Sequence, residues 1–164
     1  MNIEILQPQP WDLVGSTILI GGNAAGFEGH LSIRVSDGHT EITGAARAGS
    51  TAIRPFQASL AIPAGSGFRL SRLSLSVSDD SARGGETRPP TVTIPVLYGP
   101  LILEGYSCYW EHRVKRGDTL FSLARHYFDG DETMHSAIQL ANQHLIASPD
   151  TLAAGQVLRI PRAF

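Results

Sequence analysis

The sequence contains a single cysteine, Cys108, among its 164 residues. One thiol can form no disulfide within the chain, and it has no second thiol for a CxxC motif or a cysteine-based zinc framework. Long apolar runs are missing as well. No segment approaches the roughly eighteen consecutive apolar residues that a membrane-spanning helix needs. We therefore expect a soluble chain that folds around its own core.

Clustered positive charge is also missing. Thirteen Lys and Arg stand against fifteen Asp and Glu, and the formal net charge is −2. Binding of duplex nucleic acid depends on clustered Lys and Arg, so no nucleic-acid partner is expected. Residues 1–15 lack the basic and apolar segments of a secretory signal. The sequence predicts a cytoplasmic location if Met1 is the true start, and the periplasm or cell exterior if a leader was trimmed.

Residues 3–98 have the pattern of short strands separated by turns. Apolar and polar residues alternate in most of the candidate strands, which indicates one buried and one wet face. The candidates are residues 17–20, 31–35, 56–62, 70–77 and 92–96. Turn-forming residues lie between them, at 21–23, 37–38, 63–67 and 79–85. This spacing predicts an antiparallel β-sandwich.

The apolar spacing becomes helical after residue 119. Two sets of residues follow the i, i+3, i+4, i+7 pattern of an amphipathic helix. They are Leu120, Leu123, Ala124 and Tyr127, then Met134, Ala137, Ile138 and Ala141. Strand candidates flank the helices at residues 110–115 and 157–160, and we expect Pro161 to end the second strand. The predicted order is strand, helix, helix, strand.

The glycine-rich segment 20–29 follows a strand but does not have the spacing of a nucleotide-binding loop, and a strand pattern follows it. We expect a hairpin or bulge turn there. The sequence also has no G-x-S-x-G motif for a nucleophile. Asp79 and Asp80 lie side by side and not across a cleft, as a glycoside hydrolase would require. We therefore predict no catalytic residue, no cofactor and no enzyme.

No metal site is predicted either. The acidic run 129–132 lacks most ligand positions of a calcium loop, so we expect a solvated turn in which Asp131 or Thr133 caps the second helix. The four histidines of the second half form no HExxH motif or i, i+4 pair, and we expect them to be exposed on polar helix faces. They are His112, His126, His135 and His144.

Gly117, Asp118 and Thr119 join the first strand of this half to its first helix. Glycine permits the positive φ of an abrupt turn, and Asp or Thr can accept hydrogen bonds from the free amides of the first helical turn. We expect a helix cap. A carboxylate on those amides would occupy the place of a bound phosphate, which argues against an anion site.

Four pieces of the second half together resemble the lysin motif, LysM, in the order in which that family has them. They are residues 114–124 (VKRGDTLFSLA), Ala141-Asn142, Leu145-Ile146 and residues 154–161 (AGQVLRIP). The resemblance implies a βααβ fold in which two helices pack on one side of a two-stranded sheet. It also implies a shallow groove between the two loops that binds N-acetylglucosamine glycans such as peptidoglycan or chitin.

Transferred to this chain, the groove has one wall on each loop. The first wall would be Gly117, Asp118, Thr119 and Leu120, and the second would be Asn142, Leu145, Ile146 and Pro149. Backbone amides and carbonyls can bind acetamido groups, while Leu and Ile contact the apolar faces of sugars. Residues 144–152 form a longer second loop than the compact form, and this loop resembles that of a LysM variant that includes a cytoplasmic potassium-binding protein.

The first half resembles the immunoglobulin-like domain of bacterial spore-germination and sporulation-associated proteins. The resemblance rests on residues 3–8, 14–22, 31–37 and 56–60, and most clearly on Gly-Phe-Glu-Gly at 26–29. It implies an all-β sandwich that binds or spaces and has no catalytic site. The sequence thus predicts a sandwich over residues 1–99, a packed linker over 100–109 that holds the domains together, and an α+β LysM domain over 110–164.

Two functions remain open from the sequence. The first is a non-catalytic bacterial cell-envelope protein, in which LysM binds peptidoglycan and the sandwich is a spacer or contacts a protein partner. The second is an intracellular or phage-tail-like assembly protein that uses LysM as a docking module. The missing signal and the longer second loop favour the second function.

Overall fold

The computed structural model describes residues 3–79, 89–146, 148 and 152–163. The chain divides into two compact units, Met1–Tyr98 and Gly99–Phe164, each with its own hydrophobic core. Segment 100–109 lies in the second unit, where a 3₁₀ turn (Gly99–Leu101) precedes the first strand. That this segment holds the two units together stays a prediction.

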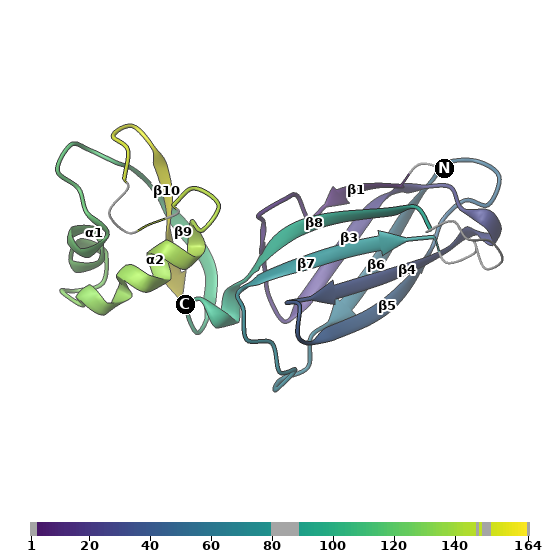
Figure 1. Ribbon diagram of the computed structural model, residues 1–164, viewed down its shortest axis with the longest axis horizontal. Coiled ribbons are helices and arrows are strands. Elements are labelled where there is room, and N and C mark those ends of the chain that lie inside the picture. Colours follow the sequence, from purple (N-terminus) through teal and green to yellow (C-terminus); the bar gives the residue numbers. More distant parts are fainter. Residues whose placement is uncertain (1–2, 80–88, 147, 149–151, 164) are drawn as a thin grey trace. The chain divides into compact units, whose positions relative to one another are not determined.

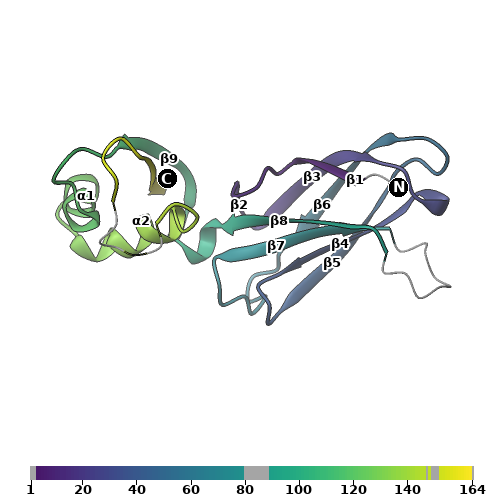
Figure 2. The ribbon, with the colours of Figure 1, turned by 45° about the horizontal axis from the view of Figure 1, so that its top comes forward.

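The first unit is a sandwich of two sheets. One sheet has the strand order β1-β3-β6 and the other β2-β8-β7-β4-β5, as Figures 1 and 2 show. The strands are β1 (Ile3–Gln7), β2 (Leu13–Val14), β3 (Thr17–Ala24), β4 (His30–Ser36), β5 (Glu41–Arg47), β6 (Arg54–Ala61), β7 (Arg72–Ser78) and β8 (Thr91–Tyr98). All pairs are antiparallel except the short β2–β8 pair, which is parallel.

Alternation along the strands builds the core of this unit. Ile33 on β4 and Leu75 on β7 are buried, and so are Ile20 on β3 and Phe56 on β6 in the opposite sheet. These side chains belong to one apolar cluster, because each strand turns every second residue inward. The predicted all-β sandwich is confirmed.

The turn predicted at residues 21–23 is wrong, because these residues lie inside β3. Gly22 pairs with Ile5 of β1 and with Phe56 of β6. A Cβ at Gly22 would lie 1.9 Å from the carbonyl oxygen of Glu4 and 2.9 Å from Cε1 of Phe56. Gly22 is required because the backbone of β1 and the ring of Phe56 lie too close for any side chain, and not because the chain turns.

The second unit has two helices and a two-stranded antiparallel sheet. Its elements are β9 (Tyr106–Arg113), α1 (Leu120–Tyr127), a 3₁₀ turn (Glu132–Met134), α2 (His135–Ala141) and β10 (Val157–Ala163). Leu158 and Ile160 of β10 share one buried cluster with Leu120, Leu123 and Ile138 of the helices. The predicted βααβ order is confirmed, and Figure 1 shows both helices beside the β9–β10 pair.

Pro161 does not end the last strand as predicted. It pairs with Tyr109, and β10 continues to Ala163. In a two-stranded sheet each strand has a free outer edge, so a residue without an N–H is tolerated where that edge needs no donor.

Candidate functional site

The loop between β9 and α1 is a tight turn with a well-defined helix cap. Gly117 has φ of 94°, a conformation that favours glycine. Thr119 is the N-cap: its Oγ1 accepts from the Ser122 amide at 3.0 Å, and the Ser122 hydroxyl accepts from the Thr119 amide at 3.0 Å. This reciprocal pair is a capping box, which fixes the loop against the first turn of the helix.

Asp118 does not cap α1, contrary to one of the two expectations for this loop. Its Oδ2 accepts from the amide of Lys115 at 2.7 Å and from Nε2 of His112 at 2.8 Å. The Lys115 amide first, and then His112, hold the pKa of the carboxyl below its ordinary value. The Asp118 carboxylate therefore does not occupy the free amides of α1, where Thr119 and Ser122 form the cap instead.

His112 is enclosed and not exposed on a helix face as predicted. Its side chain is 14% exposed, and Nδ1 lies 3.0 Å from the hydroxyl of Tyr127. Strand alternation places His112 on the same face of β9 as Trp110, opposite core residues of β10. The alternation of β9 is therefore the sequence signal that could have predicted an enclosed position for His112.

The other histidines divide between exposed and partly enclosed positions. His126 is exposed, as predicted. His135 is half-buried, and its ring stacks on Phe121 with centroids 4.2 Å apart. His144 lies after α2, is also half-buried, and has its pKa lowered by burial and then by the charge of Arg159. The expectation of exposed helical histidines is thus wrong for three of the four.

Asn142 on the second wall is fully buried and cannot touch a ligand. Its Nδ2 donates to the carbonyls of Ile138 and Arg159, both at 2.7 Å, and its Oδ1 accepts from the Arg159 amide at 2.8 Å. The side-chain amide bonds the free edge of β10 as a neighbouring strand would. We assign Asn142 to holding α2 against β10 and no longer to the groove.

Leu120 and Ile146 are also buried, and they bring the two loops together. Both belong to the core cluster that includes Val114, the residue immediately after β9. Beside Ile146, Leu145 is 46% exposed, and its carbonyl accepts from Nε2 of Gln156 at 3.3 Å. The predicted Pro149 lies outside the described residues.

The surface open to a ligand at this place is therefore smaller than the predicted groove. It consists of Gly117, Asp118 and Thr119 on the first loop and Leu145 on the second. Polar groups from one loop and an apolar side chain from the other suit a ligand with both hydroxyl and apolar faces. Sequence reasoning missed His112, Tyr127 and Gln156, which support this surface from behind.

In the acidic turn between the helices, one carboxylate caps a 3₁₀ turn and another forms an ion pair. Asp131 Oδ1 accepts from the amide and the hydroxyl of Thr133, at 2.9 and 2.6 Å, so it caps the 3₁₀ turn that leads into α2. Arg125 donates to Glu132 from Nε at 3.0 Å. Among the described residues, no group of three or more His, Cys, Asp or Glu could hold a metal ion.

The second unit also has a cavity of about 300 Å³ at the other end of α1. Its lining is mostly apolar and aromatic, and the Trp110 and Tyr127 ring centroids are 5.5 Å apart. Arg162 lies over the Trp110 ring at 3.9 Å. This aromatic cavity is a second concave place on the unit.

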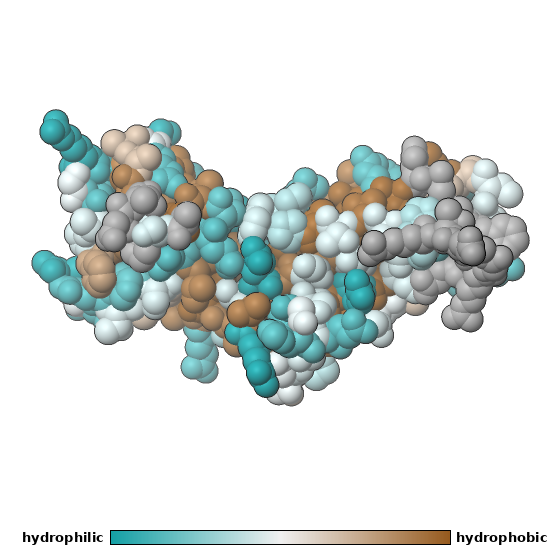
Figure 3. All heavy atoms as spheres, viewed as in Figure 1, coloured by the Kyte–Doolittle hydropathy of each residue, from teal (hydrophilic) through white to brown (hydrophobic). Residues whose placement is uncertain are grey.

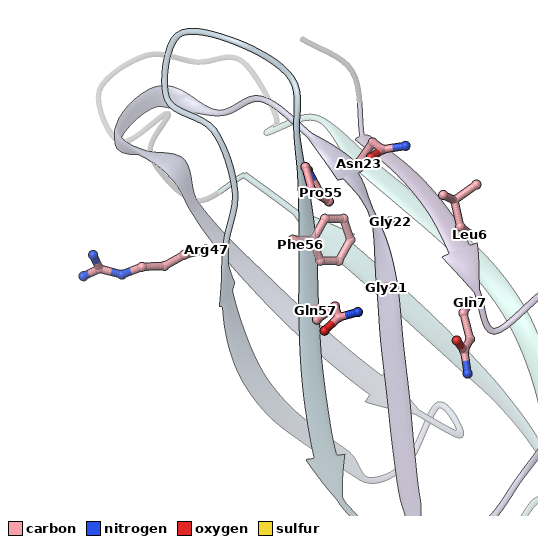
Figure 4. Close-up of a pocket in the computed structure, with 9 residues that line it drawn as sticks. All are labelled: Leu6, Gln7, Gly21, Gly22, Asn23, Arg47, Pro55, Phe56 and Gln57. Carbon is pink, nitrogen blue, oxygen red and sulfur yellow. The ribbon is translucent and has the colours of Figure 1, made fainter.

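The first unit has a cavity of about 530 Å³. Figure 4 shows Gln7, Phe56 and Gln57 beside the bare backbone of Gly21 and Gly22, with a further lining residue, Arg47, extending away from them. On the face in Figure 3, hydrophobic and hydrophilic residues are interspersed in both units.

Comparison with protein families gives two matches, on separate parts of the chain. Residues 2–86, more than half of the chain, match the model Gmad2, described as the immunoglobulin-like domain of bacterial spore germination. Residues 112–161 match the LysM domain. No curated protein matches the chain. In the described residues, no helix is long and apolar enough to cross a membrane.

The matches agree with the two folds and with the motifs that predicted them. LysM domains bind N-acetylglucosamine glycans in general, are commonly associated with the cell envelope, and, like immunoglobulin-like domains, are typically non-catalytic. The matched LysM segment contains both loops of the ligand surface described above. The chain belongs to the Gmad2 family of immunoglobulin-like domains of bacterial spore germination, and it carries a LysM domain after the sandwich.

Proposed function

We propose that this chain is a non-catalytic cell-envelope protein whose LysM domain binds peptidoglycan or a related N-acetylglucosamine glycan. The observation that carries the proposal is the rigid, capped loop of Gly117, Asp118 and Thr119, which lies inside the LysM match and leaves polar groups exposed. The sandwich would be a spacer or a surface for a protein partner. One such surface is small, so we expect weak binding that several copies strengthen.

Sedimentation with purified peptidoglycan tests this function. Leu145→Asp places a charge on the exposed wall of the surface, and we expect roughly tenfold less protein to sediment, because a desolvated charge opposes an apolar contact. Leu19→Asp is the matched control, since Leu19 is 59% exposed in the first unit. If wild type stays in the supernatant, or if both variants sediment like wild type, the proposal is wrong.

A second candidate function is docking within an intracellular or phage-tail-like assembly. The aromatic cavity of the second unit favours it, because apolar and aromatic pockets anchor protein contacts. In that case Met134→Glu, which charges the cavity wall, would abolish the assembly contact and leave peptidoglycan sedimentation unchanged.

A further inference from the structure

His112 and Tyr127 lie outside the exposed ligand surface, yet hydrogen bonds join both to it. Asp118 Oδ2 is 2.8 Å from His112 Nε2, and His112 Nδ1 is 3.0 Å from the Tyr127 hydroxyl. Asp118 is in the loop, His112 is on β9 and Tyr127 is the last residue of α1. These contacts therefore tie the loop to the strand before it and to the far end of the helix after it.

The chemistry of the three groups determines which atom donates. An ionised carboxylate only accepts, so Nε2 of His112 carries the hydrogen that Asp118 receives. In a neutral ring Nδ1 is then an acceptor, and the Tyr127 hydroxyl donates to it. In a protonated ring both nitrogens donate, and the tyrosine oxygen accepts. Both contacts survive in either state, so the ring stays in one orientation.

Tyr127 is itself fixed by aromatic neighbours. Its ring centroid is 5.5 Å from that of Trp110 and 4.7 Å from that of His126. Trp110 is on β9 and His126 precedes Tyr127 in α1, so strand and helix both restrict the tyrosine. A restricted hydroxyl holds the His112 ring from the side opposite Asp118.

One oxygen of Asp118 remains for a ligand. Both hydrogen bonds to Asp118 end on Oδ2, and the side chain is 22% exposed. Within the part of the chain that the structure describes, Oδ1 accepts no hydrogen bond. An oxygen in this position can accept from a sugar hydroxyl or an acetamido N–H.

We infer that His112 is a positioning residue for glycan binding, because it holds the Asp118 carboxylate with Oδ1 facing the ligand. This inference rests on the proposed function of the loop. Without the donor on His112, Asp118 keeps only the Lys115 amide and can rotate. The fraction of molecules with the loop in its binding conformation then falls, and the apparent affinity falls with it.

Two substitutions separate hydrogen bonding from packing at residue 112. His112→Gln keeps an N–H donor at about the reach of Nε2 but removes the ring. His112→Phe keeps a ring of similar shape against Tyr127 but removes both nitrogens. Tyr127→Phe removes only the hydroxyl that orients His112. Thermal unfolding of each variant shows whether the unit is folded.

Two measurements then give the answer. The first is the affinity for a soluble N-acetylglucosamine oligomer, for which we expect His112→Gln near wild type, Tyr127→Phe slightly weaker and His112→Phe weaker by roughly tenfold. The second is hydrogen exchange at the Lys115 amide, which donates to the same carboxylate oxygen. We expect it to be faster in His112→Phe by roughly fivefold or more, and unchanged in His112→Gln.

The reverse ranking overturns the inference. If His112→Phe binds glycan at least as tightly as His112→Gln, and its Lys115 amide exchanges no faster, His112 acts only by packing. If wild type binds no glycan, the proposed function fails, but Lys115 exchange still tests whether His112 holds the loop. If glycan binds and all three variants bind and exchange like wild type, the proposed function stands and the positioning role is wrong.

Discussion

Asp37 in the first unit and Asp118 in the second both bind backbone amides near a turn, but they differ in what remains exposed. Asp37 accepts from the amides of His39 and Thr40 through Oδ1 and from those of Arg69 and Leu70 through Oδ2, at 2.7 to 3.4 Å. It is only 8% exposed. Asp118 uses one oxygen for two donors and keeps the other free among the described residues.

The difference separates a structural carboxylate from one that can bind a ligand. Burial opposes ionisation of Asp37, but the amides of Arg69, Thr40 and His39 outweigh it and hold the pKa well below the ordinary 3.8. Both oxygens of Asp37 accept hydrogen bonds from backbone amides of the protein itself. A partly exposed carboxylate such as Asp118 holds its loop and still offers an acceptor outward. Both residues are aspartates, so residue type does not distinguish them. Solvent exposure and an oxygen that no internal donor uses mark Asp118 as the candidate ligand-binding residue.

The largest expected effect is that of Asp37→Ala on stability. The substitution leaves four amides without their acceptor, and we expect the first unit to lose about 3 kcal/mol of unfolding free energy. Trp11 and Trp110 are the only tryptophans, and one lies in each unit. Urea unfolding followed by Trp11 fluorescence in a Trp110→Phe background therefore reports on the first unit.

Asp12→Ala is the control for this substitution, because Asp12 accepts one exposed hydrogen bond from the Gln9 amide. It should cost well under half as much. Equal losses from the two substitutions would contradict the special role of Asp37.

Lowering the pH should reduce the stability that each aspartate gives its unit, and the reduction should be larger for Asp37. A carboxyl whose pKa is lowered by folding stabilises the protein above the unfolded pKa, and this stabilisation is lost as the pH falls through the folded pKa. We expect the stability difference between wild type and Asp37→Asn to be constant above about pH 5 and to shrink below pH 4. The corresponding change for Asp118→Asn should have the same sign and be smaller, because Asp118 has fewer donors.

The measurement is urea unfolding at a series of pH values with each tryptophan as the reporter of its own unit. A difference that grows as the pH falls would mean that the sign of the pKa shift is wrong.

Asn142→Ala should resemble Asp37→Ala more than a change at Asp118, although it lies in the second unit. It removes both partners of the Arg159 backbone, and we expect a loss of about 2 kcal/mol, read from Trp110 fluorescence. Gln143→Ala, at the next and less buried residue, is the control. A loss below that of the control would show that burial does not decide the role of these polar groups.

The smallest expected effect is at Thr119. Thr119→Ala removes the hydroxyl that accepts from Ser122, and we expect a loss of about 1 kcal/mol from the second unit. Thr119→Ser keeps the acceptor and should remain within a few tenths of a kcal/mol of wild type. Trp110 fluorescence in urea measures both. If serine costs as much as alanine, the capping box is not what fixes the loop.

Much of the fold could be predicted because local patterns carry it. The two-residue period at residues 31–35 and 70–77 predicted β4 and β7, and the helical period beginning at Leu120 predicted α1. Strand β5 was not predicted, because its central residues are Gly44 and Ala45, which give no apolar alternation. The glycine pair of β3 has the local pattern of a turn, and only the pairing with β1 and β6, which are distant in sequence, reveals a strand.

The sequence predicted a candidate site on two loops, and the structure buries three of the residues assigned to it. Leu120, Asn142 and Ile146 belong to the motif, and the structure buries all three. A motif records which residues the fold needs as well as which ones bind, and spacing alone does not separate these roles. Asn142 shows this most clearly, because its contact with Arg159 joins residues seventeen apart in the chain.

The sequence by itself determined the two-domain order, the capped turn at Gly117 to Thr119 and the two families, because periodicity and short motifs depend on near neighbours. Only the tertiary structure decided which motif residues face outward and that Asp118 bonds His112 and not the helix. Those outcomes depend on strand pairing and helix packing, which bring β9, the loop and the end of α1 within hydrogen-bond distance. Local sequence patterns do not determine the distances between these three segments.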